Sequence, residues 1–229
     1  MKQTWHDLLF AHWPVPPAAL RPIVPSALSL DRFDGQCWVG VVPFWMSGVR
    51  ARGLPPVPGL SRFPELNVRT YVTHAGKPGV YFFSLDAGNL PAVWAGRTFF
   101  HLPYHHASMT SVESKGAIHY SSQRHARSAN FHGSYRPTTS PLVRDRGTLA
   151  DFLTSRYRLY ATHQNRVYCC DIHHLPWPLQ DAEAEFENNT VAAAAHIALP
   201  DIAPLLHFAK RLDVLIWPLR HADGPGTRV

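Results

Sequence analysis

The strongest constraint on the fold is an alternation of polar and apolar residues over 65–72, in the order Glu-Leu-Asn-Val-Arg-Thr-Tyr-Val. Successive side chains of a strand point to opposite faces, so this segment predicts a strand whose two faces differ. The face that can pack on a core carries Leu66, Val68, Thr70 and Val72. The other face carries an acid, an amide, a guanidinium and a phenol, from Glu65, Asn67, Arg69 and Tyr71. That row is either the polar floor of a ligand cavity or a solvated outer face.

The composition favours a β-rich chain with a large core. Of the 229 residues, 45% are hydrophobic and 17% are charged, so a sizeable core is available and disorder is not expected. The 21 prolines and 14 glycines are spread along the sequence, which favours many short elements over long helices. We expect a single domain over residues 1–229.

Neither nucleic acid nor a membrane is expected as a partner, and the cysteines favour a reducing compartment. The formal charge is +6, but the 18 arginines and 4 lysines are scattered and no nucleic-acid motif is present. The first residues resemble no secretory signal, and no stretch reaches the roughly 18 apolar residues of a membrane span. Three cysteines, of which Cys169 and Cys170 are adjacent, make a poor disulfide framework. We therefore expect a reduced, cytoplasmic protein.

Periodicity and turn signals predict about nine strands and two or three short helices. The expected strands are 5–13, 36–45, 65–72, 80–87, 108–114, 117–124, 158–162, 166–173 and 208–219. The expected helices are a short turn within 18–25, residues 90–100, and a segment that Thr148 caps. Residues 181–197 have helical propensity but lie among strands, and 50–61 form a Pro/Gly-rich loop that is either a flap or a connector. The fold class is mainly β, an antiparallel barrel or sandwich with appended helices.

The histidines do not define a metal site. His101, His105, His106, His173 and His174 gather in two places. His101 and His105 have the four-residue offset of two ligands on a helix, but a proline at position 103 spoils that geometry. No His-Glu-x-x-His or Cys-x-x-Cys pattern occurs. We expect no bound metal.

Motifs for nucleophilic catalysis or nucleotide binding are also absent from the sequence. There is neither a Gly-x-Ser-x-Gly elbow nor a Gly-x-Gly-x-x-Gly phosphate loop, so we expect no nucleotide cofactor. Ser84 and Asp86 share one predicted face with Phe82, and Asp86 is expected to face Glu65 across the hairpin. In a pocket, Glu65 could act as a base while Arg69 holds a substrate carboxylate. The alternative is that the two charges neutralise each other structurally.

Several segments resemble a known superfamily. Residues 19–31, Ala-Leu-Arg-Pro-Ile-Val-Pro-Ser-Ala-Leu-Ser-Leu-Asp, are similar to the early motif of the acetoacetate decarboxylase superfamily. Residues 96–103, Gly-Arg-Thr-Phe-Phe-His-Leu-Pro, resemble the segment that leads to that family's catalytic lysines. Over nearly its whole length the chain more closely resembles the YqjF-like proteins, an uncharacterised family of that superfamily. That likeness rests on His12–Pro16, Val41–Phe44, Pro64–Val72, Tyr81–Asp86 and Leu102–Tyr104.

The resemblance implies a single acetoacetate decarboxylase-like domain, a β-barrel or cone with a central cavity and flanking helices. It also shows a departure, because the family's two lysine positions hold Tyr104 and His105, which cannot form a Schiff base. Lys115 is the only lysine nearby and falls in a predicted hairpin turn. The family's substrate-binding arginine would fall at about Pro14, and only its pocket glutamate has a counterpart, Glu65. Decarboxylation through an iminium is therefore not expected.

Together these observations predict a closed cavity for a small carbonyl or carboxylate compound, without a cofactor. We expect its wall to contain Glu65, Asn67, Arg69, Ser84, Asp86, Tyr104 and His105. If the protein is an enzyme, the expected chemistry is lyase- or hydrolase-like, with Glu65 or His105 moving a proton and Tyr104 donating to an oxyanion. The alternatives are a non-catalytic binding module and a structural protein whose barrel is filled by side chains. A homo-oligomer is expected by analogy alone.

Overall fold

The computed structural model describes residues 1–126 and 129–223, which form thirteen strands and three α-helices. The strands are β1 (Lys2–Val15), β2 (Ser29–Leu30), β3 (Cys37–Arg50), β4 (Phe63–His74), β5 (Lys77–Ala87), β6 (Tyr104–Ser114), β7 (Ala117–Arg124), β8 (Asn130–Pro137), β9 (Arg158–His163), β10 (Arg166–His173), β11 (Gln180–Asn189), β12 (Leu205–Ile216) and β13 (Arg220–His221). The helices are α1 (Pro17–Leu20), α2 (Leu90–Phe100) and α3 (Leu149–Thr154), with a 3₁₀ turn at Ala193–Ala195. None of these helices has the length and hydropathy that a membrane crossing requires.

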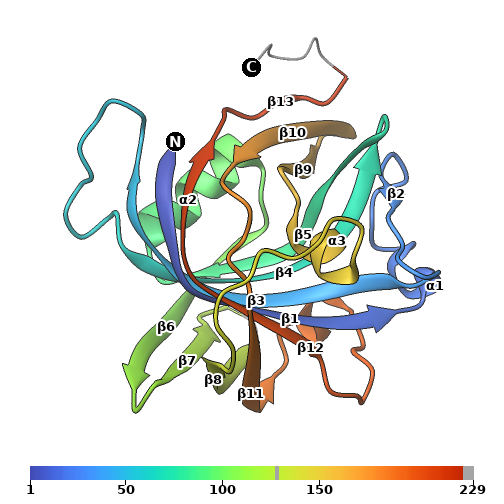
Figure 1. Ribbon diagram of the computed structural model, residues 1–229. Coiled ribbons are helices and arrows are strands. Elements are labelled where there is room, and N and C mark those ends of the chain that lie inside the picture. The colour runs from blue at the N-terminus through green and yellow to red at the C-terminus, as the bar shows by residue number, and fades with distance from the viewer. Residues whose placement is uncertain (127–128, 224–229) are drawn as a thin grey trace.

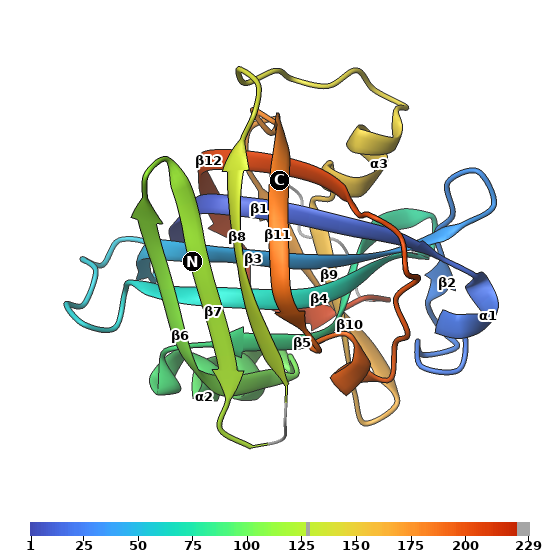
Figure 2. The ribbon, with the colours of Figure 1, turned by 90° about the horizontal axis from the view of Figure 1, so that it is seen from below.

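All strands belong to one sheet that closes on itself in a barrel- or cone-like ring. The neighbours run β13-β10-β9-β5-β6-β7-β8-β11-β12-β1-β3-β4-β2, and β10 also pairs with β12 and β5 with β4. One closed circuit therefore runs β10-β9-β5-β4-β3-β1-β12, and we call it the seven-strand circuit. In Figure 1 the strands β6, β7, β8 and β11 lie below the long strands β1, β3 and β4, whereas α2, α3, β9 and β10 lie above them. Figure 2 shows the lower layer crossing the long strands.

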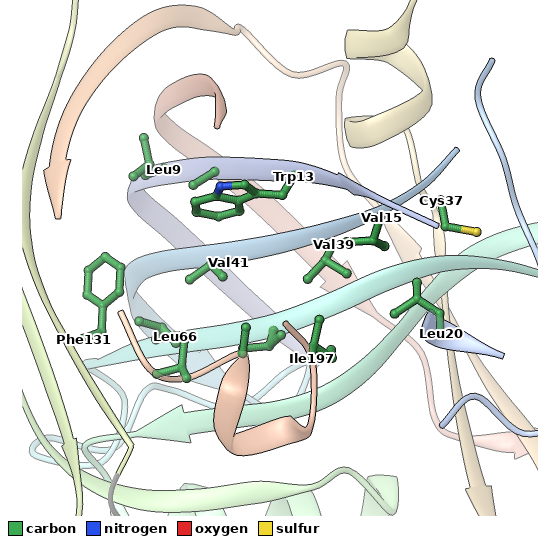
Figure 3. Packing of buried hydrophobic residues seen from close by; sticks show 14 of the residues in the cluster. Leu9, Trp13, Val15, Leu20, Cys37, Val39, Val41, Leu66, Phe131 and Ile197 are labelled. Atoms are coloured by element: carbon green, nitrogen blue, oxygen red, sulfur yellow. The ribbon is translucent and has the colours of Figure 1, made fainter. Parts of the chain in front are cut away.

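The long strands bury side chains on both faces because each face is covered by another layer. On the lower side, Leu9, Val41 and Leu66 pack with Phe131 and the other residues of one core cluster (Figure 3). On the upper side, a second cluster joins the long strands to the helices and to β9 and β10. Its buried members include Phe10, Val42, Phe44, Phe82, Val93 and Leu153. The cavity described in the next subsection lies in the upper layer.

The structure confirms the predicted fold class and most of the predicted elements. The helix over 90–100 is present, and its first turn is capped by the Asn89 side chain, which accepts a hydrogen bond from the Ala92 amide at 3.0 Å. Thr148 caps α3 in the same way. The ambiguous segment 181–197 is mostly strand, β11, followed by the 3₁₀ turn. Strands β2, β8 and β13 are not among the predicted strands.

Candidate functional site

The seven-strand circuit encloses a cavity of about 160 Å³. Every strand of that circuit contributes to its wall, and α2 covers one side. The wall is mostly apolar, with Val42, Phe44, Phe82, Leu85, Ile172 and Trp177 among its residues. Its polar side chains are Gln3, Glu65, Asn67, Arg69, Tyr104, Thr154, Arg156 and His174, together with the indole of Trp5. A few polar groups in an apolar wall are the usual composition of a small-molecule site.

Strand β4 supplies a row of three polar side chains to this wall. Glu65, Asn67 and Arg69 project into the cavity from alternate positions, as the alternation predicts. The fourth member of the predicted row, Tyr71, is fully buried but does not line the cavity. Its hydroxyl donates to the Leu153 carbonyl at 2.7 Å and lies 2.6 Å from Nε2 of the buried His12. Tyr71 therefore fixes β4 against the end of α3.

Glu65 is buried and titrates near neutral pH. Burial raises the pKa of its carboxyl from the ordinary 4.5 to about 7, because a carboxylate withdrawn from water is penalised. Two hydrogen bonds oppose that rise, one from Asn67 and one from the Tyr104 hydroxyl, which lies 2.7 Å from Oε2. The charge of Asp86 adds to the rise. Glu65 is thus able to gain or lose a proton at physiological pH.

Tyr104 reaches Glu65 because α2 carries a glycine at the contact. Burial, followed by the charge of Glu65, raises the pKa of the Tyr104 phenol well above its usual value, so the hydroxyl stays a donor. A Cβ on Gly96 would overlap the Tyr104 ring. The glycine leaves room for the ring against the helix, while Arg97 Nε donates to the Tyr104 carbonyl at 2.8 Å. Since the hydroxyl proton is directed at Glu65, Tyr104 orients the acid rather than presenting a free donor to the cavity.

Arg69 brings a guanidinium without a carboxylate partner into the cavity. In the part of the chain that the structure describes, its side chain donates to Tyr71 and to the Leu153 carbonyl at 3.5 Å, and no ion pair includes it. Its Nε is buried and has no hydrogen-bond partner among the described residues. The other guanidinium in the wall, that of Arg156, is held by Asp31 at 2.5 Å. Arg69 is therefore the group that can bind an anion.

Ser84 and Asp86 do not line this cavity, so that geometric prediction was wrong. Both side chains are buried on the opposite side of β5, where they meet Arg124 of β7. Arg124 Nε donates to Asp86 Oδ1 at 2.5 Å and its Nη2 to the Ser84 hydroxyl at 2.8 Å. The Ser122 hydroxyl donates to Asp86 at 3.0 Å. This network holds β5 to β7 and does not face Glu65.

A β-bulge explains the error. Asp86 pairs with Leu66 across the hairpin, and residues directly opposite each other in an antiparallel pair share a face. Further along, Phe82 pairs with Arg69, so Phe83 is the extra residue of the bulge. The bulge turns Phe82 into the cavity while residues 84 and 86 point away from it. The sequence pattern alone placed all three on one face.

His105 also lies outside the cavity, contrary to prediction. It follows Tyr104 on β6, and successive strand residues face opposite ways. Of the remaining histidines in the predicted clusters, His101 stacks on His163 with ring centroids 4.1 Å apart, and His106 stacks on His125. Within residues 1–126 and 129–223, no three His, Cys, Asp or Glu side chains converge as metal ligands would.

Several wall residues have no signal in the sequence. Arg156, His174 and Trp177 come from loops next to α3 and β10, and only closure of the circuit brings them to β4. Trp5 and Gln3 alternate on β1 and could have been found by the same periodicity as the β4 row. All four lysines lie in the described part of the chain, and none of them lines the cavity.

Similar folds have been solved for acetoacetate decarboxylase-like proteins. Acetoacetate decarboxylase from Legionella pneumophila has a TM-score of 0.65 at 12% identity, over 96% of this chain and 87% of that one. The enduracididine biosynthesis enzyme MppR complexed with pyruvate gives 0.67 at 12% identity, over 96% and 89%. An acetoacetate decarboxylase-like enzyme from Sphingomonas wittichii gives 0.66 at 15% identity, over 97% and 92%. The chain thus has the acetoacetate decarboxylase-like fold.

Sequence comparison then gives the family. The model of DUF2071, described as an uncharacterized conserved protein, matches residues 2–213, and the chain belongs to this family. The uncharacterized protein YqjF of Bacillus subtilis is 55% identical over 221 residues, which is 96% of this chain and 91% of that protein. The resemblance inferred from the sequence motifs is confirmed.

Proposed function

We propose that this protein binds a small organic acid in the cavity of the seven-strand circuit and that Glu65 exchanges a proton with it. One observation carries the proposal. Arg69, which pairs with no carboxylate of the described residues, and Glu65, whose pKa is about 7, line the same apolar cavity. A guanidinium in an apolar wall recognises a carboxylate. A carboxyl that titrates near pH 7 serves as a general acid or base.

The size of the cavity supports a ligand of a few heavy atoms. Its 160 Å³ is close to the roughly 150 Å³ of an engineered apolar cavity that binds benzene. The structural neighbour MppR has been solved with pyruvate, a three-carbon keto acid, and that ligand is of the size and charge proposed. The absence of a lysine from the described cavity wall supports acid–base chemistry rather than a Schiff base.

Calorimetric and thermal-shift titrations with small carboxylic acids test the proposal. We expect at least one acid of three to five carbons to bind and to raise the melting temperature. The Arg69→Met variant should bind it at least about tenfold more weakly, because a charge-assisted pair is lost. Arg136→Met is the matched control, since that side chain lies on the surface and 56% of it is exposed. Equal binding by the wild type and Arg69→Met would contradict the assignment of the anion site.

Turnover separates the enzyme from the second candidate, a binding module. The Glu65→Gln variant keeps the shape of the side chain but cannot take up a proton. If the bound acid is converted by the wild type and not by Glu65→Gln, the proton-transfer role holds. If the acid binds equally to both and neither converts it, the protein is a binding module.

We also propose a reducing, cytoplasmic compartment for the protein. The buried, unpaired Cys37, Cys169 and Cys170 support it.

A further inference from the structure

The proposed function gives no role to Asn67, the third polar side chain of the β4 row in the cavity. The Asn67 side chain is only 4% exposed, and it lines the cavity next to Glu65 on β4. Its amide hydrogen-bonds the Glu65 carboxylate, which can only accept while ionised, so the amide nitrogen must face Glu65. The Asn67 Oδ1 atom is then left buried, with no hydrogen-bond partner in residues 1–126 and 129–223.

Other donors in the wall are already engaged in hydrogen bonds or have no partner among the described residues. The Tyr104 hydroxyl donates to Glu65, and Arg156 Nη1 donates to Asp31. Two further buried atoms without partners, Arg69 Nε and Trp5 Nε1, are both donors. Within the part of the chain that the structure describes, the cavity therefore has two donors and one acceptor without hydrogen-bond partners. Buried polar groups are nearly always satisfied in a functional complex, and the ligand is the group that can complete this set.

We propose that Asn67 determines specificity by accepting a hydrogen bond from a hydroxyl group of the bound acid, so that the ligand is a small hydroxycarboxylate rather than a simple or oxo acid. The inference rests on the proposed function, since Arg69 holds the carboxylate. Asn67 and Arg69 are two residues apart on one strand face, which separates their Cα atoms by about 7 Å. Two side chains at that spacing can contact the two ends of one small hydroxy acid.

The test uses two matched trios of acids that differ only in the group facing Asn67. One trio is propanoate, 2-hydroxypropanoate and 2-oxopropanoate, and the other is butanoate, 3-hydroxybutanoate and 3-oxobutanoate. Calorimetry at pH 8 keeps Glu65 ionised and the Asn67 amide oriented. We expect the hydroxy acid of at least one trio to bind about tenfold or more tightly than both partners, because a site with an unmet acceptor rejects analogues without the donor.

Two variants test whether Asn67 is the source of the preference for the hydroxy acid. Asn67→Leu has a similar shape but no acceptor, and it should reduce the preference for the hydroxy acid to less than threefold. Phe82→Leu alters the apolar wall and leaves the acceptor, and it should keep the preference. Circular dichroism establishes that each variant is folded. If Asn67→Leu does not fold, the wild-type comparison of the two trios still decides.

The outcomes for the two proposals differ. If the three acids of each trio bind equally well, Asn67 Oδ1 is satisfied by water alone and this inference is overturned, whereas the proposed function stands. A preference that persists in Asn67→Leu would also overturn it. If no acid of either trio binds to the wild type while another acid of three to five carbons does, this inference is overturned. If no acid of that size binds, or if binding is unchanged in Arg69→Met, the proposed function itself is contradicted.

Discussion

At the residue scale, the properties of Glu65 follow from a competition between burial and hydrogen bonding. Its side chain has lost water, and the donors from Tyr104 and Asn67 compensate only in part. The result is a carboxyl whose pKa is raised to about 7. A buried carboxylate lowers the free energy of unfolding when it is charged. The same burial gives Glu65 a pKa suited to proton transfer near neutral pH.

The pH dependence of stability tests this directly. Between pH 4.5 and about 7 the native protein holds a proton on Glu65 that the unfolded chain has lost. The free energy of unfolding should therefore fall as the pH rises through that window, by roughly 3 kcal/mol in total, and then level off. Glu65→Gln removes the titrating group, so the difference in unfolding free energy between the two proteins should grow in favour of the variant from pH 4.5 to 7. Denaturant unfolding across pH measures it, and a constant difference would contradict the account.

At the element scale, the positions of the side chains depend on how strands and helices meet. The contact between α2 and β6 places Tyr104 on Glu65, and Gly96 permits that contact. The buried network of Asp86 and Arg124 holds β5 to β7 on the other side of the sheet. Each contact leads to a prediction.

Gly96→Ala should destabilise the protein although alanine favours a helix by about 1 kcal/mol over glycine. The added methyl group overlaps the Tyr104 ring and displaces it from Glu65. Because the Tyr104 hydrogen bond lowers the pKa of Glu65, its loss should raise that pKa further. Thermal unfolding and the pH profile of stability measure both effects. Thr98→Ala, on the exposed side of α2, is the control and should be neutral or stabilising. A stabilised Gly96→Ala protein with an unchanged pH profile would show that the ring contact is unimportant.

Arg124→Met should cost about 3–5 kcal/mol, because it leaves the Asp86 carboxyl buried without its counter-charge. The side chains of both residues are almost fully buried, and burial already raises the pKa of Asp86. Adding Asp86→Asn should restore most of the lost stability, since no uncompensated charge remains. A double-mutant cycle by chemical denaturation gives the coupling. If the double variant is no more stable than Arg124→Met alone, the ion pair is not the reason for the loss.

What the sequence could predict at this scale depends on how local the signal is. The alternation from Glu65 to Arg69 correctly gave the inward face, because strand periodicity is a local property. The same logic failed for Ser84 and Asp86, since a bulge at Phe83 shifts the face and leaves no mark in the pattern. His105 was misplaced although alternation with Tyr104 would have separated the two.

At the scale of the whole molecule, the closure of the sheet creates the site. β10 reaches β12 through two residue pairs, and β9 reaches β5 through two more. Because of these short pairings, Arg156, His174 and Trp177 line the same cavity as the polar side chains of β4. Pairings between distant strands cannot be read from periodicity, which is why the motifs of the family predicted the cavity and the residues alone did not.

The closed wall also predicts which chemistry is absent. Because no lysine lines the described part of the cavity, borohydride reduction in the presence of small keto acids should give no covalent adduct. Mass spectrometry of the intact protein measures this, with an acetoacetate decarboxylase as the positive control. An adduct on any lysine would show that an amine enters the site.

The most direct test of the central claim is a crystal structure of the protein soaked with the small carboxylic acid that it binds most tightly. The account predicts one molecule inside the seven-strand circuit, with its carboxylate within roughly 3 Å of the Arg69 guanidinium and its body between Glu65 and the apolar wall. A cavity that holds only water, or an acid bound solely on the outer surface, would contradict it.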